Sequence, residues 1–364
     1  MKIIHCADLH LDSALHTHLS PEMAKQRRRE LLQTFRQMLE YAKFHDVRAI
    51  MIAGDLFDSK AVSALAGNTV LESIKAHPEI EFYYLKGNHD GDFTKREQEL
   101  PINLKLFGKT WQSYELTGSS VVISGVELSE ENAGQIYDGL VLNEKNFNIV
   151  MLHGQVSRSM SNHPENINIV ALQYKNIDYL ALGHIHSYRC DKLDERGIYC
   201  YSGCLEARGL DEVGEHGFVL LETDESGHSF TQQLIPFGKR SCRQIRVDIS
   251  GCVSTEEMAQ RIENDLKEAA ISKQDMLKLL LTGEVEVEAE KDLAMLTERF
   301  CPMFYFMKIY DQSTWKVDFR QYQPEASLRG ELIRRIQNQG DISEEEKVEM
   351  IRYGLLALAG EEIE

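Results

Sequence analysis

Acidic, amide and imidazole side chains gather in a set of short motifs in the first half of the chain. Each motif directly follows a stretch that is predicted to form a strand, and several motifs carry a glycine that permits a tight turn. Ligands of α/β proteins collect at the carboxyl ends of strands, so motifs far apart in sequence can converge in space. The five motifs are Asp8-Leu9-His10, Gly54-Asp55-Leu56-Phe57-Asp58, Gly87-Asn88-His89-Asp90, His153-Gly154 and Gly183-His184-Ile185-His186.

These side chains have the chemistry of a two-metal centre. Imidazoles and carboxylates together suit manganese, iron or zinc, whereas sites built only of oxygen atoms suit magnesium or calcium. Two neighbouring metal ions need a ligand that bridges them, and the two oxygens of Asp55 can do this. Side-chain direction has a period of two in extended chain, so Asp8 and His10 point to the same side. The same spacing applies to His184 and His186. One such pair is weak evidence, but five motifs in order predict a two-metal phosphodiesterase.

Strands and helices that would position these motifs alternate through the first 235 residues. An amphipathic pattern over residues 21–45 predicts a helix with Leu32, Phe35 and Leu39 on one face. Early strands alternate with helices and later strands crowd together, which indicates a mixed α/β sandwich flanked by helices. A second helix is predicted at 62–76, and strands are predicted at 2–6, 49–53, 81–85, 121–126, 148–152, 179–182, 198–201 and 218–221.

The pattern restarts after Pro236-Phe237-Gly238-Lys239, where a domain boundary is predicted. The predicted elements beyond it are strands at 243–249, 277–281 and 304–309, with helices at about 254–270 and 291–300. This order is typical of a small α+β domain, and nothing in it looks catalytic. The predicted division of the chain is 1–237, 240–322 and a helical tail at 326–364.

The helical tail combines an apolar face with an acidic one. Its apolar positions are Leu328, Leu332, Ile333, Ile336, Val348, Ile351, Leu355 and Leu358. Two interpretations remain open at this point. The helices either fold back on the body of the protein, or they dock a partner helix or coiled coil.

Length and composition limit the function. The 364 residues carry a formal net charge of −18 at pH 7, which argues against nucleic-acid binding over the whole surface. A local basic patch and bound metal ions can still create a DNA site. The seven cysteines show no paired spacing, which indicates neither a disulfide framework nor structural zinc and favours the reducing cytoplasm. No membrane span or signal peptide is predicted.

The motifs resemble the signature of the calcineurin-like metallophosphoesterase superfamily. Similarity to its DNA repair exonuclease branch, the SbcD-like nuclease subunits, is carried by IIHCADLHLDS, AGDLFD, LKGNHD and DYLALGHIH. The segment YSGCLEARGLDEVGEHGFVLLE resembles the end of the nuclease domain in that branch, and Asp12-Ser13 is more similar to its YhaO-type subgroup. The resemblance implies that the small second domain is a capping domain and that the tail binds an ATPase.

The resemblance also implies a role for each motif residue. One metal ion would be held by Asp8, His10, Asp55 and His186, and the other by Asp55, Asn88, His153 and His184. Manganese is the expected metal, with iron and zinc as alternatives. His89 is expected to act on the scissile phosphate, stabilising the transition state or protonating the leaving oxygen. Asp58 and Asp90 are expected to orient imidazoles, although Asp58 could instead cap a helix.

A metal-dependent DNA exonuclease or endonuclease of DNA repair is the function that the resemblance implies. It would work as a homodimer with an SMC-like coiled-coil ATPase docked on the tail. A metallophosphoesterase for small phosphodiesters, nucleotides or phosphoproteins is the alternative, although it would not need the extra domain and tail. A non-catalytic scaffold is disfavoured because every expected ligand is present. Candidate contacts to DNA phosphates are Arg27, Arg28, Arg29, Lys95, Arg96, Arg158, Arg189 and Arg208.

Overall fold

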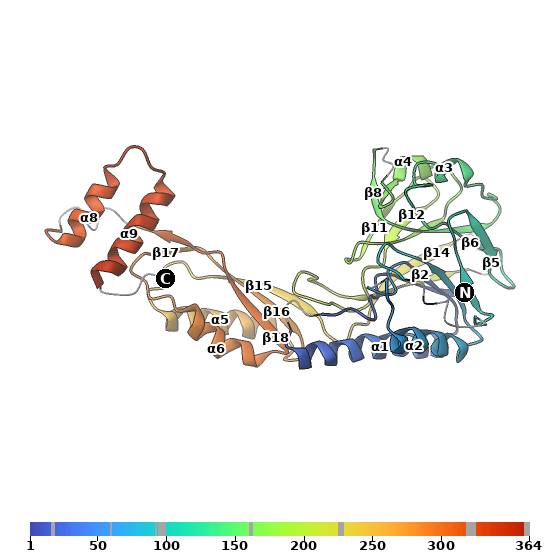
Figure 1. Cartoon of the computed structure of the whole chain (residues 1–364), viewed down its shortest axis with the longest axis horizontal. Coiled ribbons are helices and arrows are strands. Elements are labelled where there is room, and N and C mark those ends of the chain that lie inside the picture. The colour runs from blue at the N-terminus through green and yellow to red at the C-terminus, as the bar shows by residue number, and fades with distance from the viewer. Residues whose placement is uncertain are drawn as a thin grey trace. The chain divides into compact units, whose positions relative to one another are not determined.

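The computed structural model describes residues 1–15, 19–58, 60–91, 93, 100–159, 163–224, 229–317 and 325–359. The chain divides into two compact units, Met1–Ser241 and Cys242–Glu364 (Figure 1). Lys95 and Arg96 lie outside the described residues. Among the described helices, none is long and apolar enough to cross a membrane.

A largely parallel sheet in the first unit carries three of the five motifs. Its strands are β1 (Lys2–Cys6), β2 (Val47–Ala53), β3 (Glu81–Leu85), β4 (Leu104–Leu106), β13 (Gly217–Thr223) and β14 (Phe230–Pro236). In the described part of the chain their order is β14-β13-β1-β2-β3-β4. Because β1, β2 and β3 pair in parallel, their carboxyl ends meet at one edge of the sheet.

A second sheet in the same unit carries the other two motifs. Its strands are β5 (Gln112–Glu115), β6 (Val121–Gly125), β7 (Phe147–His153), β10 (Tyr179–Gly183), β11 (Arg189–Lys192) and β12 (Ile198–Tyr201). The order among described residues is β11-β12-β10-β7-β6-β5. The parallel pair β7 and β10 brings His153 and Gly183 level with each other. A short pair, β8 (Gln155–Ser157) and β9 (Asn166–Asn168), lies in the segment between them.

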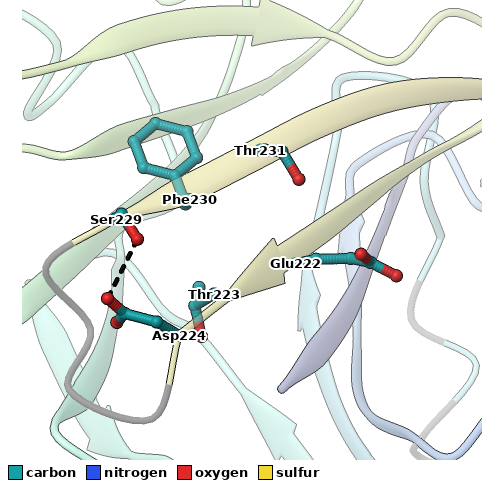
Figure 2. Close-up of a pocket in the computed structure, with 6 residues that line it drawn as sticks. All are labelled: Glu222, Thr223, Asp224, Ser229, Phe230 and Thr231. Carbon is teal, nitrogen blue, oxygen red and sulfur yellow. Dashed lines mark hydrogen bonds between the residues drawn. The ribbon is translucent and has the colours of Figure 1, made fainter.

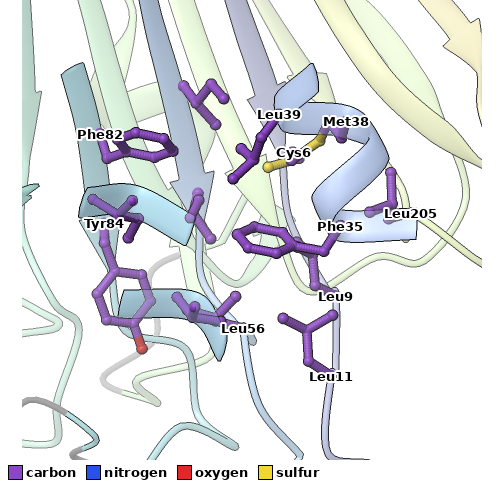
Figure 3. Packing of buried hydrophobic residues seen from close by; sticks show 14 of the residues in the cluster. Cys6, Leu9, Leu11, Phe35, Met38, Leu39, Leu56, Phe82, Tyr84 and Leu205 are labelled. Carbon is purple, nitrogen blue, oxygen red and sulfur yellow. The ribbon is translucent and has the colours of Figure 1, made fainter. Parts of the chain in front are cut away.

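Helices cover the outer faces of both sheets. They are α1 (Pro21–Phe44), α2 (Ala64–Lys75), α3 (Ile136–Gly139) and α4 (Ile169–Leu172). The hydroxyl of Ser20 caps α1 by accepting a hydrogen bond from the amide of Met23, and Pro21 stands in the first turn, where its missing N–H costs nothing. Phe35 and Leu39 recur at helical spacing and pack against the first sheet (Figure 3).

Three hydrophobic layers hold the first unit together. The first lies between the first sheet and its helices, and Figure 3 shows Phe35 and Leu39 beside Cys6 in it. The second lies between the two sheets and includes Ile3 and Ile149. The third covers the outer face of the second sheet. Strands covered on both faces are mainly apolar, as in β2 and β7, where the exceptions are Arg48, Asn148 and His153. The predicted α/β sandwich flanked by helices is confirmed.

The second unit has its own core. Its strands are β15 (Cys242–Asp248), β16 (Met276–Thr282), β17 (Glu284–Glu286), β18 (Phe306–Asp311) and β19 (Thr314–Lys316), with helices α5 (Thr255–Ala269), α6 (Leu293–Phe300), α8 (Leu328–Gln337) and α9 (Glu344–Ala359). Strands β15, β16 and β18 form a parallel sheet, and α5 and α6 contribute apolar side chains to the same core.

The two tail helices form part of this second unit. Ile333, Ile336 and Ile351 pack with Val287 and Val317 in a small separate core. The tail therefore folds back on its own unit through one face. Other apolar side chains of the tail stay exposed, namely Leu328, Met350, Tyr353 and Leu358.

Candidate metal centre

The five motifs converge because the loops after β1, β2, β3, β7 and β10 are tied to one another. The amide of Asp8 donates to the carbonyl of Gly54 at 3.0 Å, and the amide of His10 donates to the carbonyl of Asp55 at 3.0 Å. The amide of His184 donates to both carboxylate oxygens of Asp8 at 3.0 Å, which joins the second sheet to the first. The loops after β1, β2 and β10 are thus fixed by neighbours from other strands.

Backbone conformation at the site is unusual. Asp8, His10, Asp55 and His184 all have positive φ, at 53°, 45°, 50° and 96°. Side-chain-bearing residues avoid this region, so a cluster of four marks a place where local strain is held by the surrounding structure. Gly87 is required for close approach, because a Cβ there would lie 2.1 Å from an oxygen of Asp55.

One group of candidate ligands consists of Asp8, His10 and His186. One ligand atom of each lies within 4.8 Å of the others. The Nε2 atoms of His10 and His186 are 3.3 Å apart, and Nε2 of His10 is 3.8 Å from Oδ2 of Asp55. These four residues are the predicted ligands of the first metal ion, and the structure brings them together.

A second group consists of Asp8, Asp55 and His153, again with ligand atoms within 4.8 Å of one another. Nε2 of His153 is 3.4 Å from Oδ2 of Asp55 and 3.0 Å from Oδ1 of Asn88. The ring of His184 lies beside His153, with 5.5 Å between centroids. Asp8 belongs to both groups. Asp55, which alone was predicted to bridge the two ions, lies near His10 of one group and His153 of the other.

The protonation of the site fits a cation. Burial by itself lowers the pKa of His153, but its hydrogen bond to Asp55 and the charges of Asp8 and Asp55 raise that pKa to about 9. Burial raises the pKa of Asp55, and the hydrogen bond with His153 outweighs it, bringing the pKa to about 2. The carboxylates therefore favour a positive charge on the imidazole beside them. A divalent cation with imidazole and carboxylate ligands can take its place.

Asp58 holds the ring of His10. Its Oδ1 lies 3.0 Å from Nδ1 of His10, which leaves Nε2 of the ring facing the cluster. The hydroxyl of Ser13 donates to Asp58 at 2.8 Å. The alternative role as a helix cap does not apply, because the N-cap of α2 is Ser63.

Asp90 has a different role from the one predicted. Its carboxylate accepts hydrogen bonds from the amides of Leu56, Phe57 and Gly87, at 3.3, 2.8 and 2.9 Å. It thus joins the loops after β2 and β3 through their backbones, whereas the prediction had it orienting an imidazole. Burial raises the pKa of Asp90 to about 6.

His89 lies at the open rim of the cluster. Half of its side chain is exposed, and Nδ1 is 3.6 Å from Oδ1 of Asp58. Its ring centroid is 5.5 Å from that of His10, and its amide donates to Asp55 at 3.0 Å. His89 belongs to neither candidate ligand group found among the described residues.

Glu212 and Arg208 lie beside His186, and sequence reasoning did not predict that they support its ring. Oε1 of Glu212 lies 2.7 Å from Nδ1 of His186, which directs Nε2 of the ring toward the cluster. Burial raises the pKa of Glu212, but the hydrogen bond with His186 and the charge of Arg208 bring it to about 2. Glu212 lies in the segment that carried the family resemblance, yet its position 26 residues after His186 follows no ligand spacing.

The predicted phosphate-contacting arginines differ in their surroundings. Arg208 is held 3.1 Å from Glu212 and 3.4 Å from Asp58, so it belongs to the wall of the site. Arg27 is fully buried in ion pairs with Glu30 and Glu206, which corrects its prediction as a DNA contact. Arg28 donates to a carbonyl, whereas Arg29, Arg158 and Arg189 are exposed.

A surface pocket lies away from this cluster. Figure 2 shows it at the hairpin of β13 and β14, where Asp224, Ser229 and Phe230 line it. Glu222 pairs with Lys2, at the start of β1, whereas the metal ligands follow the end of that strand. The pocket is therefore at the opposite edge of the sheet.

Residues 1–188 match the calcineurin-like phosphoesterase family. The match covers more than half of the 364 residues, so the chain belongs to this family and is a metal-dependent phosphoesterase. The predicted superfamily is confirmed.

Two named proteins and one solved structure are similar to this chain. The uncharacterized metallophosphoesterase YhaO of Bacillus subtilis is 29% identical over 249 residues, which are 64% of this chain and 60% of that protein. The chain thus matches about three fifths of the length of YhaO. The DNA double-strand break repair protein Mre11 of Aeropyrum pernix is 25% identical over 322 residues, covering 80% of this chain and 74% of its own. The crystal structure of TT1561 of Thermus thermophilus has a TM-score of 0.41 and 12% identity, covering 64% of this chain and 98% of its own.

Proposed function

We propose that this chain is a two-metal DNA nuclease that acts in DNA repair as an exonuclease or endonuclease. The observation that carries the proposal is the pair of ligand groups that share Asp8, with the half-exposed His89 beside them. Similarity to a protein named for double-strand break repair supports DNA as the substrate. That similarity covers 80% of the chain, so it extends beyond the 241 residues of the first unit.

The proposed ligands of one cation are Asp8, His10, Asp55 and His186, and those of the other are Asp55, Asn88, His153 and His184. Manganese is the proposed metal, because mixed imidazole and carboxylate ligands suit it. When bound, the two cations would polarise the phosphoryl group and activate the attacking water.

The side chains around the ligands have their own tasks. Asp58 and Glu212 fix the rings of His10 and His186, so that each presents Nε2 to the cluster. His89 is exposed enough to reach a substrate, and its proposed role is to protonate the leaving oxygen or to stabilise the charge of the transition state.

The proposed partner is an SMC-like coiled-coil ATPase, bound by a homodimer of this chain in the cytoplasm. Support comes from the exposed apolar side chains of the tail, of which Met350, Tyr353 and Leu358 lie on α9. An apolar helix face of this kind is what a helix or coiled coil docks against.

Activity assays test the proposal. Purified protein with Mn²⁺ is given a linear DNA duplex, a DNA hairpin and bis-p-nitrophenyl phosphate. We expect cleavage of DNA as well as of the small diester. His89→Ala should lower turnover by about 10²–10⁴-fold, the usual contribution of a general acid. His45→Ala, at the end of α1, is the matched control and should retain activity.

The alternative is a phosphoesterase for small phosphodiesters or nucleotides. The net charge of −18 favours it, since it opposes DNA binding. Cleavage of bis-p-nitrophenyl phosphate with both DNA substrates left intact would reject the nuclease proposal in favour of this one. DNA degradation that requires an added coiled-coil ATPase would support the proposed partnership.

A further inference from the structure

Two cysteines that are ten residues apart in sequence face each other across a hairpin. Cys190 on β11 and Cys200 on β12 are direct partners in the antiparallel register. Both are free thiols. Side chains of directly opposite residues lie on the same face of a sheet, so the two thiols are neighbours.

The position of this pair in the ladder brings the side chains especially close. The amide of Ile198 donates to the carbonyl of Asp178, away from β11. Alternate residues of a strand direct their amides to the same side, so the amide of Cys200 also points away from β11. Cys190 and Cys200 are therefore a non-hydrogen-bonded pair, for which the Cα atoms lie about 4.5 Å apart. Disulfides form when this distance is about 4.4–6.8 Å.

The two thiols differ in access. Cys200 is buried between the two sheets, whereas Cys190 is partly exposed on β11, an edge strand among the described residues. The interaction with Cys200 lowers the pKa of Cys190, whereas the interaction with Cys190 and burial raise the pKa of Cys200. Cys190 is thus the thiol that solvent-borne oxidants reach, and Cys200 is the neighbour that can resolve it.

We propose that Cys190 and Cys200 are a redox-active dithiol that hydroperoxides convert into a cross-strand disulfide. The sulfur of Cys190 attacks the peroxide and the O–O bond breaks. One oxygen stays on Cys190 as a sulfenic acid, and the other leaves as an alcohol, or as water when the oxidant is hydrogen peroxide. The sulfur of Cys200 then attacks that sulfenic acid, the S–O bond breaks, and water leaves. In total, two thiols and one hydroperoxide give one disulfide, one alcohol and one water.

The disulfide would act on the hairpin that supports the metal centre. Strand β11 begins three residues after His186, and β12 leads to Cys204, whose amide donates to the carbonyl of His186 at 3.0 Å. The same stretch continues to Glu212, which holds the ring of His186. A covalent link between β11 and β12 therefore restricts local opening of the hairpin that follows that histidine.

Mapping of the disulfide tests this inference on the full-length native protein. The protein is reduced, freed of reductant, treated with hydrogen peroxide, alkylated and digested without reduction for mass spectrometry. We expect a peptide pair joined through Cys190 and Cys200, lighter by two hydrogen atoms than the separate peptides. The other five cysteines should be recovered in their alkylated form. Recovery of both Cys190 and Cys200 as alkylated thiols, or a link that forms only in urea, would overturn the proposal.

Hydrogen exchange supplies a second readout. Oxidation should slow amide exchange in β11 and β12 of the native protein, and Cys190→Ser should abolish this slowing. Cys301→Ser removes another partly exposed thiol and should leave both the link and the slowing in place. Equal exchange before and after oxidation, in protein shown to carry the link, would refute the effect on the hairpin.

Discussion

His186 illustrates how single residues complete the site. Its ring is fixed by Glu212 at 2.7 Å, while Arg208 neutralises part of the charge of that carboxylate at 3.1 Å. Asp58 lies in the corresponding place behind His10, with its Oδ1 3.0 Å from Nδ1 of the ring. Each candidate ligand ring on this side of the cluster is therefore oriented by a carboxylate behind it, which raises its basicity toward a metal.

Replacing Glu212 tests this at the residue scale. Glu212→Gln keeps the shape and an acceptor oxygen but removes the charge behind His186. We expect Mn²⁺ affinity to fall by about 10–100-fold, the usual effect of losing such a partner, as measured by isothermal titration calorimetry. Glu215→Gln, an exposed neighbour, is the control. Unchanged affinity in Glu212→Gln would contradict the assigned role.

Helix α1 is joined to the segment that carries Arg208 by a buried ion network. Arg27 pairs with Glu30 at 2.7 Å and with Glu206 at 2.8 Å, and it donates to the carbonyl of Ala207 at 2.8 Å. Arg240 pairs with Glu30 at 2.7 Å from the other side. The residue next to Arg208 is thus anchored to the helix that covers the sheet.

Replacing Arg27 should lower the stability of the fold. Arg27→Met removes the ion-pair partner of the buried Glu206 and one of the ion-pair partners of Glu30, so we expect the free energy of unfolding to fall by about 3–5 kcal/mol. Arg29→Met, on the exposed face of the same helix, should change it by less than about 0.5 kcal/mol. Urea unfolding of both variants measures the difference. Equal stability of the two variants would show that the network contributes nothing.

The same network predicts a pH dependence. Burial raises the pKa of Glu30, but hydrogen bonds from Arg240 and Arg27 outweigh it and hold the pKa well below 4.5, its ordinary value. Because the folded pKa is lowered, this stabilisation is present above pH 4.5 and is lost as the pH falls further. Glu30→Gln should therefore lose stability near neutral pH and show a flatter acid limb in unfolding experiments. An unaltered acid limb would argue against it.

The helices and strands also show which parts of the fold can be predicted from local sequence patterns. Strands β1, β2 and β10 were predictable because apolar runs end directly at a ligand motif, which is a local signal. Strand β11 was missed because this exposed edge strand is polar and lacks alternation. Arg27 was misjudged for a related reason, since its buried partner Glu206 is 179 residues away. Glu212 likewise depends on a fold that returns it to His186.

For the molecule as a whole, the candidate ligands come from both sheets of the first unit. Asp8 and Asp55 follow strands of one sheet, whereas His153 and His184 belong to the other. Bound cations would therefore link the two halves of the sandwich at their shared edge. We expect this edge to hold two cations that depend on common carboxylates.

The metal content per chain shows whether two cations share these carboxylates. Native protein and Asp55→Ala are equilibrated with Mn²⁺, freed of unbound metal and measured by inductively coupled plasma mass spectrometry. Two manganese ions per chain are expected in the native protein, and Asp55→Ala should lose both, because the bridging carboxylate serves each ion. One ion per native chain, or two ions retained after Asp55→Ala, would rule out a pair of cations bridged by Asp55.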